Sequence, residues 1–228
     1  SDSTEFTAIR RDASLEALVV KSLGAHLSAG IVADAGSSTF RNQDLFLEVA
    51  PAIEYNVYPY AESSRRQLTV RYSVGPRYFE YEEETLFGRL DERVIEQQLE
   101  ASLDFQQPWG SAGVGLSTSH YIGWEPGASA PPELQADDTP RYAVRIGGGL
   151  DVRLIRGLDL NVDGSYARIN NQITLPRGDA TDEEILLEIR ELNTSYRYEL
   201  EVGLSYTFGS IYNTVVNPRF DMGRGEFN

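Results

Sequence analysis

Residues 196–208 of this chain are Tyr-Arg-Tyr-Glu-Leu-Glu-Val-Gly-Leu-Ser-Tyr-Thr-Phe. Every even position carries an aliphatic or aromatic side chain, and every odd position carries a polar or charged side chain or a glycine. Because successive side chains of a β-strand point to opposite faces, this period of two predicts a strand with one apolar and one polar face. The apolar face suits either a protein core or lipid.

The same alternation recurs in eight earlier segments, which turn-forming residues separate. The sequence therefore predicts an all-β, antiparallel up-and-down fold of about nine strands. They are expected near residues 4–21, 27–35, 45–57, 67–82, 95–105, 111–122, 141–154, 158–166 and 196–208.

The links between these segments alternate in length. Short links are expected near 22–25, 58–66, 106–110 and 155–157, and longer acidic or proline-rich links near 35–43, 83–92, 124–140 and 170–194. Outer-membrane barrels have short periplasmic turns and long external loops. This sorting favours a transmembrane β-barrel over the alternative of a soluble barrel or sandwich.

The last long link contains Thr181-Asp-Glu-Glu184, a capping-box pattern that predicts the start of a short helix. Alternatively, the ninth strand extends outward through Ile185, Leu187 and Ile189. The sequence leaves both interpretations open.

Composition excludes several classes of protein. The chain has 228 residues, a net charge of −15 and no cysteine, so a nucleic-acid partner, a disulfide framework and a thiolate metal site are excluded. The absence of any run of eighteen apolar residues excludes a transmembrane helix. We expect one barrel domain over residues 1–208, followed by a periplasmic tail over 209–228.

Charges of both signs and small residues occupy the polar faces of the strands, and the chain has a single lysine, Lys21. This composition favours a crowded lumen over a solvated surface. Glu48 and Glu54 belong to this polar set. The expected lumen ion network comprises Arg71, Arg77, Glu96, Glu100, Asp104, Arg141, Arg145, Asp151, Arg153, Asp159, Asp163, Arg197, Glu199 and Glu201.

Aromatic residues fall at or near the strand ends. Tyrosine and tryptophan settle where lipid meets water, so these residues predict two aromatic girdles, although aromatic residues also favour strands in general. The expected girdle comprises Tyr55, Tyr78, Phe105, Trp109, Trp124, Tyr142, Tyr166, Tyr196, Tyr206 and Phe208.

Strand direction predicts the extent of the whole barrel. If residue 208 lies at the periplasmic side, nine crossings place the start of the first strand outside, whereas an even-stranded antiparallel barrel has both ends on one side. We therefore expect this chain to be a fragment of a 10–12-stranded barrel that lacks an odd number of upstream strands. Alternatively, residues 3–11 pair as an extra strand.

The sequence resembles known proteins in two respects. Gly203-Leu-Ser-Tyr-Thr-Phe208 resembles the terminal strand signal of bacterial outer-membrane proteins, which the barrel-assembly machinery recognises. Leu68-Thr-Val-Arg-Tyr-Ser-Val-Gly-Pro-Arg-Tyr-Phe-Glu-Tyr81, with Leu99-Glu-Ala-Ser-Leu-Asp-Phe105, is similar to the salt-induced outer-membrane protein family of unassigned function. Two departures are that the family's barrel begins with further upstream strands, and that its chain usually stops at the terminal aromatic residue.

Catalytic chemistry is not expected. His120 and Ser119 are adjacent and point to opposite faces of a strand, and His26 lies in a turn. Acidic pairs such as Glu96 with Glu100 are expected to pair with arginine, and the acidic links are expected to be solvated. We therefore expect no cofactor, metal or catalytic residues.

The sequence as a whole predicts a bacterial outer-membrane β-barrel that acts as a structural or interaction component or as a narrow pore. The expected partners are outer-membrane lipid and lipopolysaccharide, the barrel-assembly machinery and other envelope proteins. The alternatives are an outer-membrane rim hydrolase acting on lipid or peptide, and a soluble ligand-binding β-barrel.

Overall fold

A computed structural model of the chain describes residues 11–135, 140–178, 181, 184, 185, 187 and 196–208. These residues form a single sheet of nine antiparallel strands, each paired with its sequence neighbours. The strands are β1 (Asp12–Ser22), β2 (Leu27–Ser38), β3 (Gln43–Asn56), β4 (Arg66–Glu80), β5 (Asp91–Gln107), β6 (Gly110–Ile122), β7 (Tyr142–Ile155), β8 (Leu158–Ile169) and β9 (Tyr196–Tyr206).

The strand number, order and direction confirm the prediction from the two-residue period. Most boundaries lie within a few residues of those expected, but β5 begins earlier, at Asp91. Glu92 and Val94 are buried on the same face as Glu96, so the two-residue period extends to the start of the strand. The predicted residues 4–10 of the first strand and the predicted tail over 209–228 lie outside the described residues.

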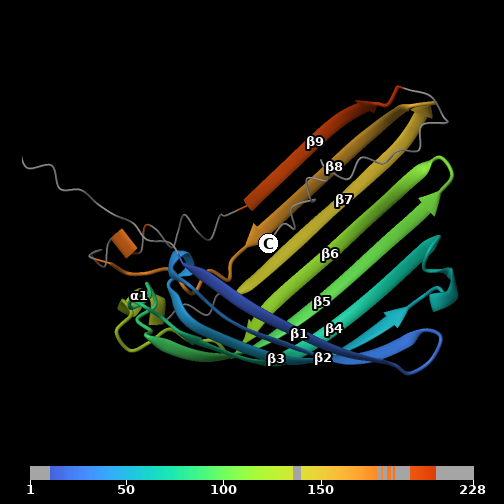
Figure 1. Cartoon of the computed structure of the whole chain (residues 1–228). Helices are drawn as coiled ribbons and strands as arrows, with labels where there is room; N and C mark the ends of the chain where they lie inside the picture. The colour runs from blue at the N-terminus through green and yellow to red at the C-terminus, as the bar shows by residue number, and fades with distance from the viewer. Residues whose placement is uncertain are drawn as a thin grey trace, which may run out of the picture.

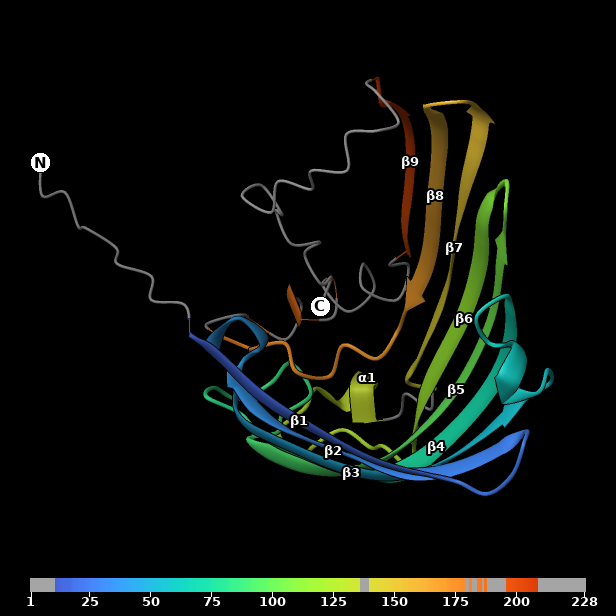
Figure 2. The ribbon, with the colours of Figure 1, turned by 45° about the vertical axis from the view of Figure 1, so that its right-hand side comes forward.

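The sheet is strongly curved and open. Strands β1 and β9 form its two edges and lie apart, as Figures 1 and 2 show. The described strands therefore make an up-and-down antiparallel wall and do not close into a barrel by themselves. The remaining helical elements are short: η1 (Thr39–Arg41), η2 (Tyr60–Glu62) and α1 (Pro132–Gln135). None of the helices in the described ranges is long and apolar enough to cross a membrane.

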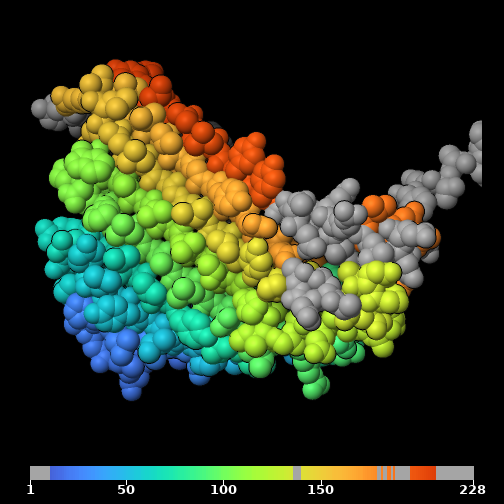
Figure 3. Space-filling view, turned by 180° about the vertical axis from the view of Figure 1, so that it is seen from behind, coloured from blue at the N-terminus to red at the C-terminus, as the bar shows by residue number. Residues whose placement is uncertain are grey.

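The two faces of the sheet differ sharply in polarity. The apolar side chains of every strand project from the convex face, where Val202 is 63% and Leu204 is 68% exposed. The polar side chains project from the concave face, where Glu48, Thr69 and Glu96 are buried. Viewed from behind, strands β4 to β8 form adjacent bands (Figure 3), and no second layer of described residues packs on their convex face.

The buried apolar core lies at the end of the sheet where the long links gather. We call the residues of these links, 81–90, 123–135 and 170–178 together with Ile185, the cap. The cap packs against the adjoining ends of β4, β5 and β6. Together they form a buried cluster of Phe79, Tyr81, Leu86, Phe87, Val94, Tyr121, Ala130, Leu134, Ile173 and Ile185.

Backbone hydrogen bonds join the links of the cap to one another. The N–H of Leu86 donates to the carbonyl oxygen of Leu175 at 2.9 Å, and the N–H of Gly127 donates to that of Phe87 at 2.7 Å. Gly88 has a φ of +69°, and a Cβ there would lie 2.5 Å from the backbone nitrogen of Ala130. The tight approach of these two links therefore requires glycine.

The capping box at Thr181 is present. The Thr181 N–H and hydroxyl donate to the Glu184 carboxylate at 2.8 and 2.9 Å, and the Ile185 N–H donates to the Thr181 carbonyl oxygen at 2.9 Å. These bonds lower the pKa of Glu184 below its ordinary value. Residues 184, 185 and 187 are helical, so the ninth strand does not extend through Ile185 and Leu187; Ile189 lies outside the described residues.

Candidate functional site

The concave face carries one continuous row of charged and small side chains. Residues that lie directly opposite each other in successive strands form this row, from β3 to β9. We call it the charged row, and it consists of Glu54, Arg71, Glu100, Ser117, Arg145, Ala167 and Arg197. Its members come from seven strands, so their order is set by the strand register and not by sequence spacing.

A second cluster lies nearer the cap. Arg77 donates to Glu48 on β3 at 2.7 Å and to Glu96 on β5 at 2.6 Å, and the exposed fractions of these carboxylate side chains are 7% and 3%. One arginine therefore bridges two buried carboxylates from the strands on either side. We call these three residues the buried triad.

Other members of the predicted network form pairs that water reaches more easily. Arg71 donates from Nε to Glu100 at 2.9 Å, and Arg197 pairs with Glu199 at 2.8 Å. Nearer the short turns, Arg153 lies 3.5 Å from the Asp159 carboxylate. Arginine and carboxylate side chains of the expected network therefore lie within ion-pair distance of each other at these positions.

The remaining predicted network residues do not all pair with an opposite charge. Asp104 and Asp151 accept hydrogen bonds from serine or asparagine side chains, from Ser102 at 3.3 Å and from Ser111 at 3.1 Å. Arg145, Asp163 and Glu201 lie on the same face and have no ion-pair partner among the residues that the structure describes.

Arg141 and Trp124 lie inside the cap, away from the other residues of the expected ion network and girdle. The Arg141 guanidinium stacks 4.6 Å from the Trp124 ring and 4.7 Å from the Phe87 ring, inside the cap. Trp124 is half-buried and donates from Nε1 to Glu92 at 2.8 Å, so it does not point outward as a girdle residue would. Both positions follow from the folding of the long links over the strand ends.

Tyr81 completes this part of the cap. Its hydroxyl donates to the Glu92 carboxylate, which also accepts the bond from Trp124. Burial raises the pKa of Tyr81 above its ordinary value, and the adjacent negative charge of Glu92 raises it further. The folded cap therefore favours the protonated form of the Tyr81 phenol.

The other predicted girdle residues lie toward the two ends of the sheet. Among those near the short turns, Tyr55, Trp109, Tyr206 and Phe208 are exposed and Phe105 is half-buried. Near the long links, Tyr166 and Tyr196 are exposed, whereas Tyr78 and Tyr142 are half-buried. The exposed tyrosines of this set lie on the same strand face as the apolar side chains.

The two histidines are held by local hydrogen bonds. His120 lies 3.1 Å from the Gln97 side-chain nitrogen on the convex side, whereas Ser119 is buried on the opposite face and accepts a bond from Asn171 at 3.3 Å. His26 bonds the carbonyl oxygen of Asn56 at 2.8 Å. Within the described ranges, no three His, Asp or Glu side chains group closely enough to hold a metal ion.

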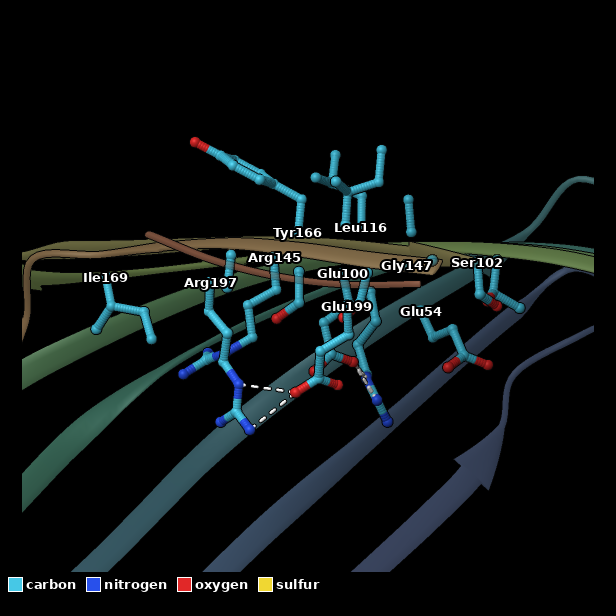
Figure 4. A pocket seen from close by; sticks show the side chains of 18 residues that line it. Glu54, Glu100, Ser102, Leu116, Arg145, Gly147, Tyr166, Ile169, Arg197 and Glu199 are labelled. Carbon is cyan, nitrogen blue, oxygen red and sulfur yellow. Dashed lines mark hydrogen bonds and ion pairs between the residues drawn. The ribbon is translucent and has the colours of Figure 1, made fainter. Parts of the chain in front are cut away.

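A hollow on the concave face lies along the charged row. It has a volume of about 730 Å³, and its lining includes Arg71, Glu100, Arg145, Arg197 and Glu199. Figure 4 shows that the labelled charged side chains project from one side of the sheet, whereas Tyr166 and Leu116 project from the other. We call this hollow the row pocket.

Sequence analysis identified the charged residues but not their partners, and it missed the cap as a unit. Glu48 was in the polar set, yet nothing in the sequence indicated that it shares Arg77 with Glu96. Glu92 carried no signal beyond its place in an acidic link. Comparison with models of protein families, with curated proteins and with solved structures finds no match for this chain.

Proposed function

We propose that this chain forms the wall of a bacterial outer-membrane β-barrel, which acts as a structural component or a narrow pore without enzymatic activity. The observation that carries this proposal is the convex face, where apolar side chains from all nine strands are exposed to the surroundings. Soluble monomers rarely expose an apolar surface of this extent. Lipid tails would cover this surface and remove it from water.

The concave face supports the same proposal. Its ion pairs, serines and glycines suit a water-containing lumen, and the alternation of polar and apolar faces along every strand is that of a membrane barrel. The aromatic side chains at the strand ends suit the two interfaces. The opposite orientation of Ser119 and His120 supports the non-enzymatic role over a rim hydrolase.

Such a barrel has to close, because an unpaired strand edge in hydrocarbon leaves backbone groups without hydrogen bonds. Strands β1 and β9 run in the same direction, since an even number of reversals separates them. Antiparallel closure therefore requires an odd number of further strands, in line with a barrel of 10–12 strands. The β9 sequence and the resemblance to the salt-induced outer-membrane protein family support assembly by the barrel-assembly machinery.

The proposal is tested by folding the chain in detergent micelles and comparing boiled and unboiled samples by gel electrophoresis. We expect the folded protein to require detergent and to migrate differently after heating. A chain that stays monodisperse and folded in buffer without detergent would contradict the membrane proposal and favour the soluble ligand-binding barrel.

A further inference from the structure

The row pocket contains polar groups that the fold itself does not use. Arg145 is exposed on the concave face, and Ser117 lies directly opposite it on β6. Ser165 lies opposite Gly147, two residues along β7 from Arg145. Among the described residues, the Arg145 guanidinium and these two hydroxyls have no hydrogen-bond partner.

The floor of the pocket beside these groups is open. Gly115 and Gly147 lie opposite each other, between Ser102 and Ser165 in the adjoining strands. A Cβ on Gly115 would meet no atom closer than 4.0 Å, and a Cβ on Gly147 would make only ordinary contacts, at 3.5 Å and beyond. The packing of the sheet therefore does not require glycine at either position, and the space above them is free for a ligand.

The charges around the floor set the chemistry of that ligand. The guanidinium of Arg145 has five N–H donors, which suit a carboxylate or phosphate group. Glu199 lies opposite Ser165, and Glu54 lines the far side of the pocket. These carboxylates repel a second anionic group and accept hydrogen bonds, so the rest of the ligand has to present hydroxyl donors.

We propose that the row pocket binds an anionic sugar, that is, a sugar acid or a sugar phosphate. Its oxyanion lies on Arg145, and its hydroxyl groups contact Ser117, Ser165 and the flanking carboxylates. The pocket volume of about 730 Å³ is in the range of small-molecule sites and well above the size of an inorganic anion. The inference does not rest on the membrane proposal, because the concave face alone forms the pocket.

The test is titration calorimetry on the folded full chain, in detergent or in buffer, whichever keeps it monodisperse. The probes are glucose 6-phosphate, gluconate, glucose and inorganic phosphate. We expect glucose 6-phosphate or gluconate to bind, with the stronger of the two identifying the oxyanion, and both glucose and inorganic phosphate to bind at least tenfold more weakly.

Two variants test the assignment of the site. Arg145→Gln is expected to weaken binding about tenfold or more, because it removes a hydrogen bond to a charged group. Gly147→Leu is expected to abolish binding by filling the floor while the strand content stays unchanged by circular dichroism. Arg153→Gln, on the same strand and face, is the matched control and is expected to bind normally.

The proposal is overturned if neither anionic sugar binds, if glucose binds as well as they do, or if Arg145→Gln binds like the unmodified chain. Equal binding of inorganic phosphate and glucose 6-phosphate would overturn the role of the hydroxyl contacts. Because binding is measured in either medium, these outcomes are independent of whether the chain requires detergent.

Discussion

Arg77 illustrates how much a single buried charge can matter in this sheet. Its guanidinium contacts both Glu48 and Glu96, and both carboxylates are almost fully removed from solvent. Breaking a buried ion pair by removing one partner is costly, because the remaining charge has no compensation. Removing Arg77 therefore destabilises the sheet more than removing an arginine of an exposed pair on the same face.

We expect Arg77→Met to lower the free energy of unfolding by about 3–5 kcal/mol, since two buried carboxylates lose their only positive partner among the described residues. Arg153→Met is the matched control, because its pair with Asp159 is exposed and such pairs contribute about 0–1 kcal/mol. The measurement is denaturant unfolding followed by circular dichroism. An equal decrease in the free energy of unfolding in the two variants would contradict the larger effect expected for the buried triad.

Tyr81 predicts the response of the cap to alkaline pH. Its pKa is raised in the folded state by burial and by Glu92, so the folded cap holds the phenolic proton more tightly than the unfolded chain does. The resulting stabilisation is present below the ordinary tyrosine pKa of about 10 and is lost as the pH rises above it.

We expect the stability of the cap to fall as the pH rises above about 10, and to fall less steeply in Tyr81→Phe. Trp124 fluorescence during denaturant unfolding reports the cap, with Trp109→Phe in both chains to remove the only other tryptophan. The slope of stability against pH is the readout, because losing the bond to Glu92 also lowers stability at neutral pH. Identical slopes would contradict the role of Tyr81.

At the scale of the element, each strand has two faces with different surroundings. Leu99 projects from the convex face of β5 and is 40% exposed, whereas the adjacent Gln98 is half-buried on the concave face. A charge on a lipid-facing position costs about 2–4 kcal/mol near the bilayer midplane, but a charge in a lumen is tolerated. Neighbouring residues therefore test what each face contacts.

We expect Leu99→Arg to lower the free energy of unfolding in lipid vesicles by about 2–4 kcal/mol, because the new charge faces lipid. Gln98→Arg is expected to change the free energy of unfolding by much less. In Gln98→Arg the new charge lies between Glu96 and Glu100 on the same face, which further favours it. Folding is measured by the heat-modifiable gel shift against urea concentration. A neutral effect of Leu99→Arg would mean that water, and not lipid, covers this face.

The elements themselves were largely predictable, and the reason is local. Alternation along residues 196–208, or along 67–82, depends only on the pleat of the strand, so the nine strands and their order follow from the sequence. The capping box at Thr181 and Glu184 was equally visible. The choice between a helix and an extended ninth strand needed the fold, because both patterns fit the same residues.

At the scale of the whole molecule, the sheet is an open wall whose concave face is predominantly acidic. The acidic side chains on this face outnumber its arginines. They include Asp104, Asp151, Asp163 and Glu201. In a closed barrel this excess would attract cations to the lumen.

We expect planar-bilayer recordings of the reconstituted protein to show K⁺ passing in preference to Cl⁻, as judged from the reversal potential in a salt gradient. The preference is expected to be mild, because five arginines share the face, namely Arg71, Arg77, Arg145, Arg153 and Arg197. Complete absence of conductance would instead support the structural role, with the interior filled. Anion-selective current would contradict the charge argument.

The sequence by itself determined the all-β class, the number and direction of the strands, and which side chains share a face, because these depend on a two-residue period and on local turns. The tertiary structure alone decided that Arg77 bridges Glu48 and Glu96, that Arg145 has no ionic partner among the described residues, and that Trp124 belongs to the cap. These contacts depend on strand register and on links such as that of Thr85 with Pro176, residues far apart in the chain. No local pattern encodes such contacts, because the residues that make them come from different strands and links.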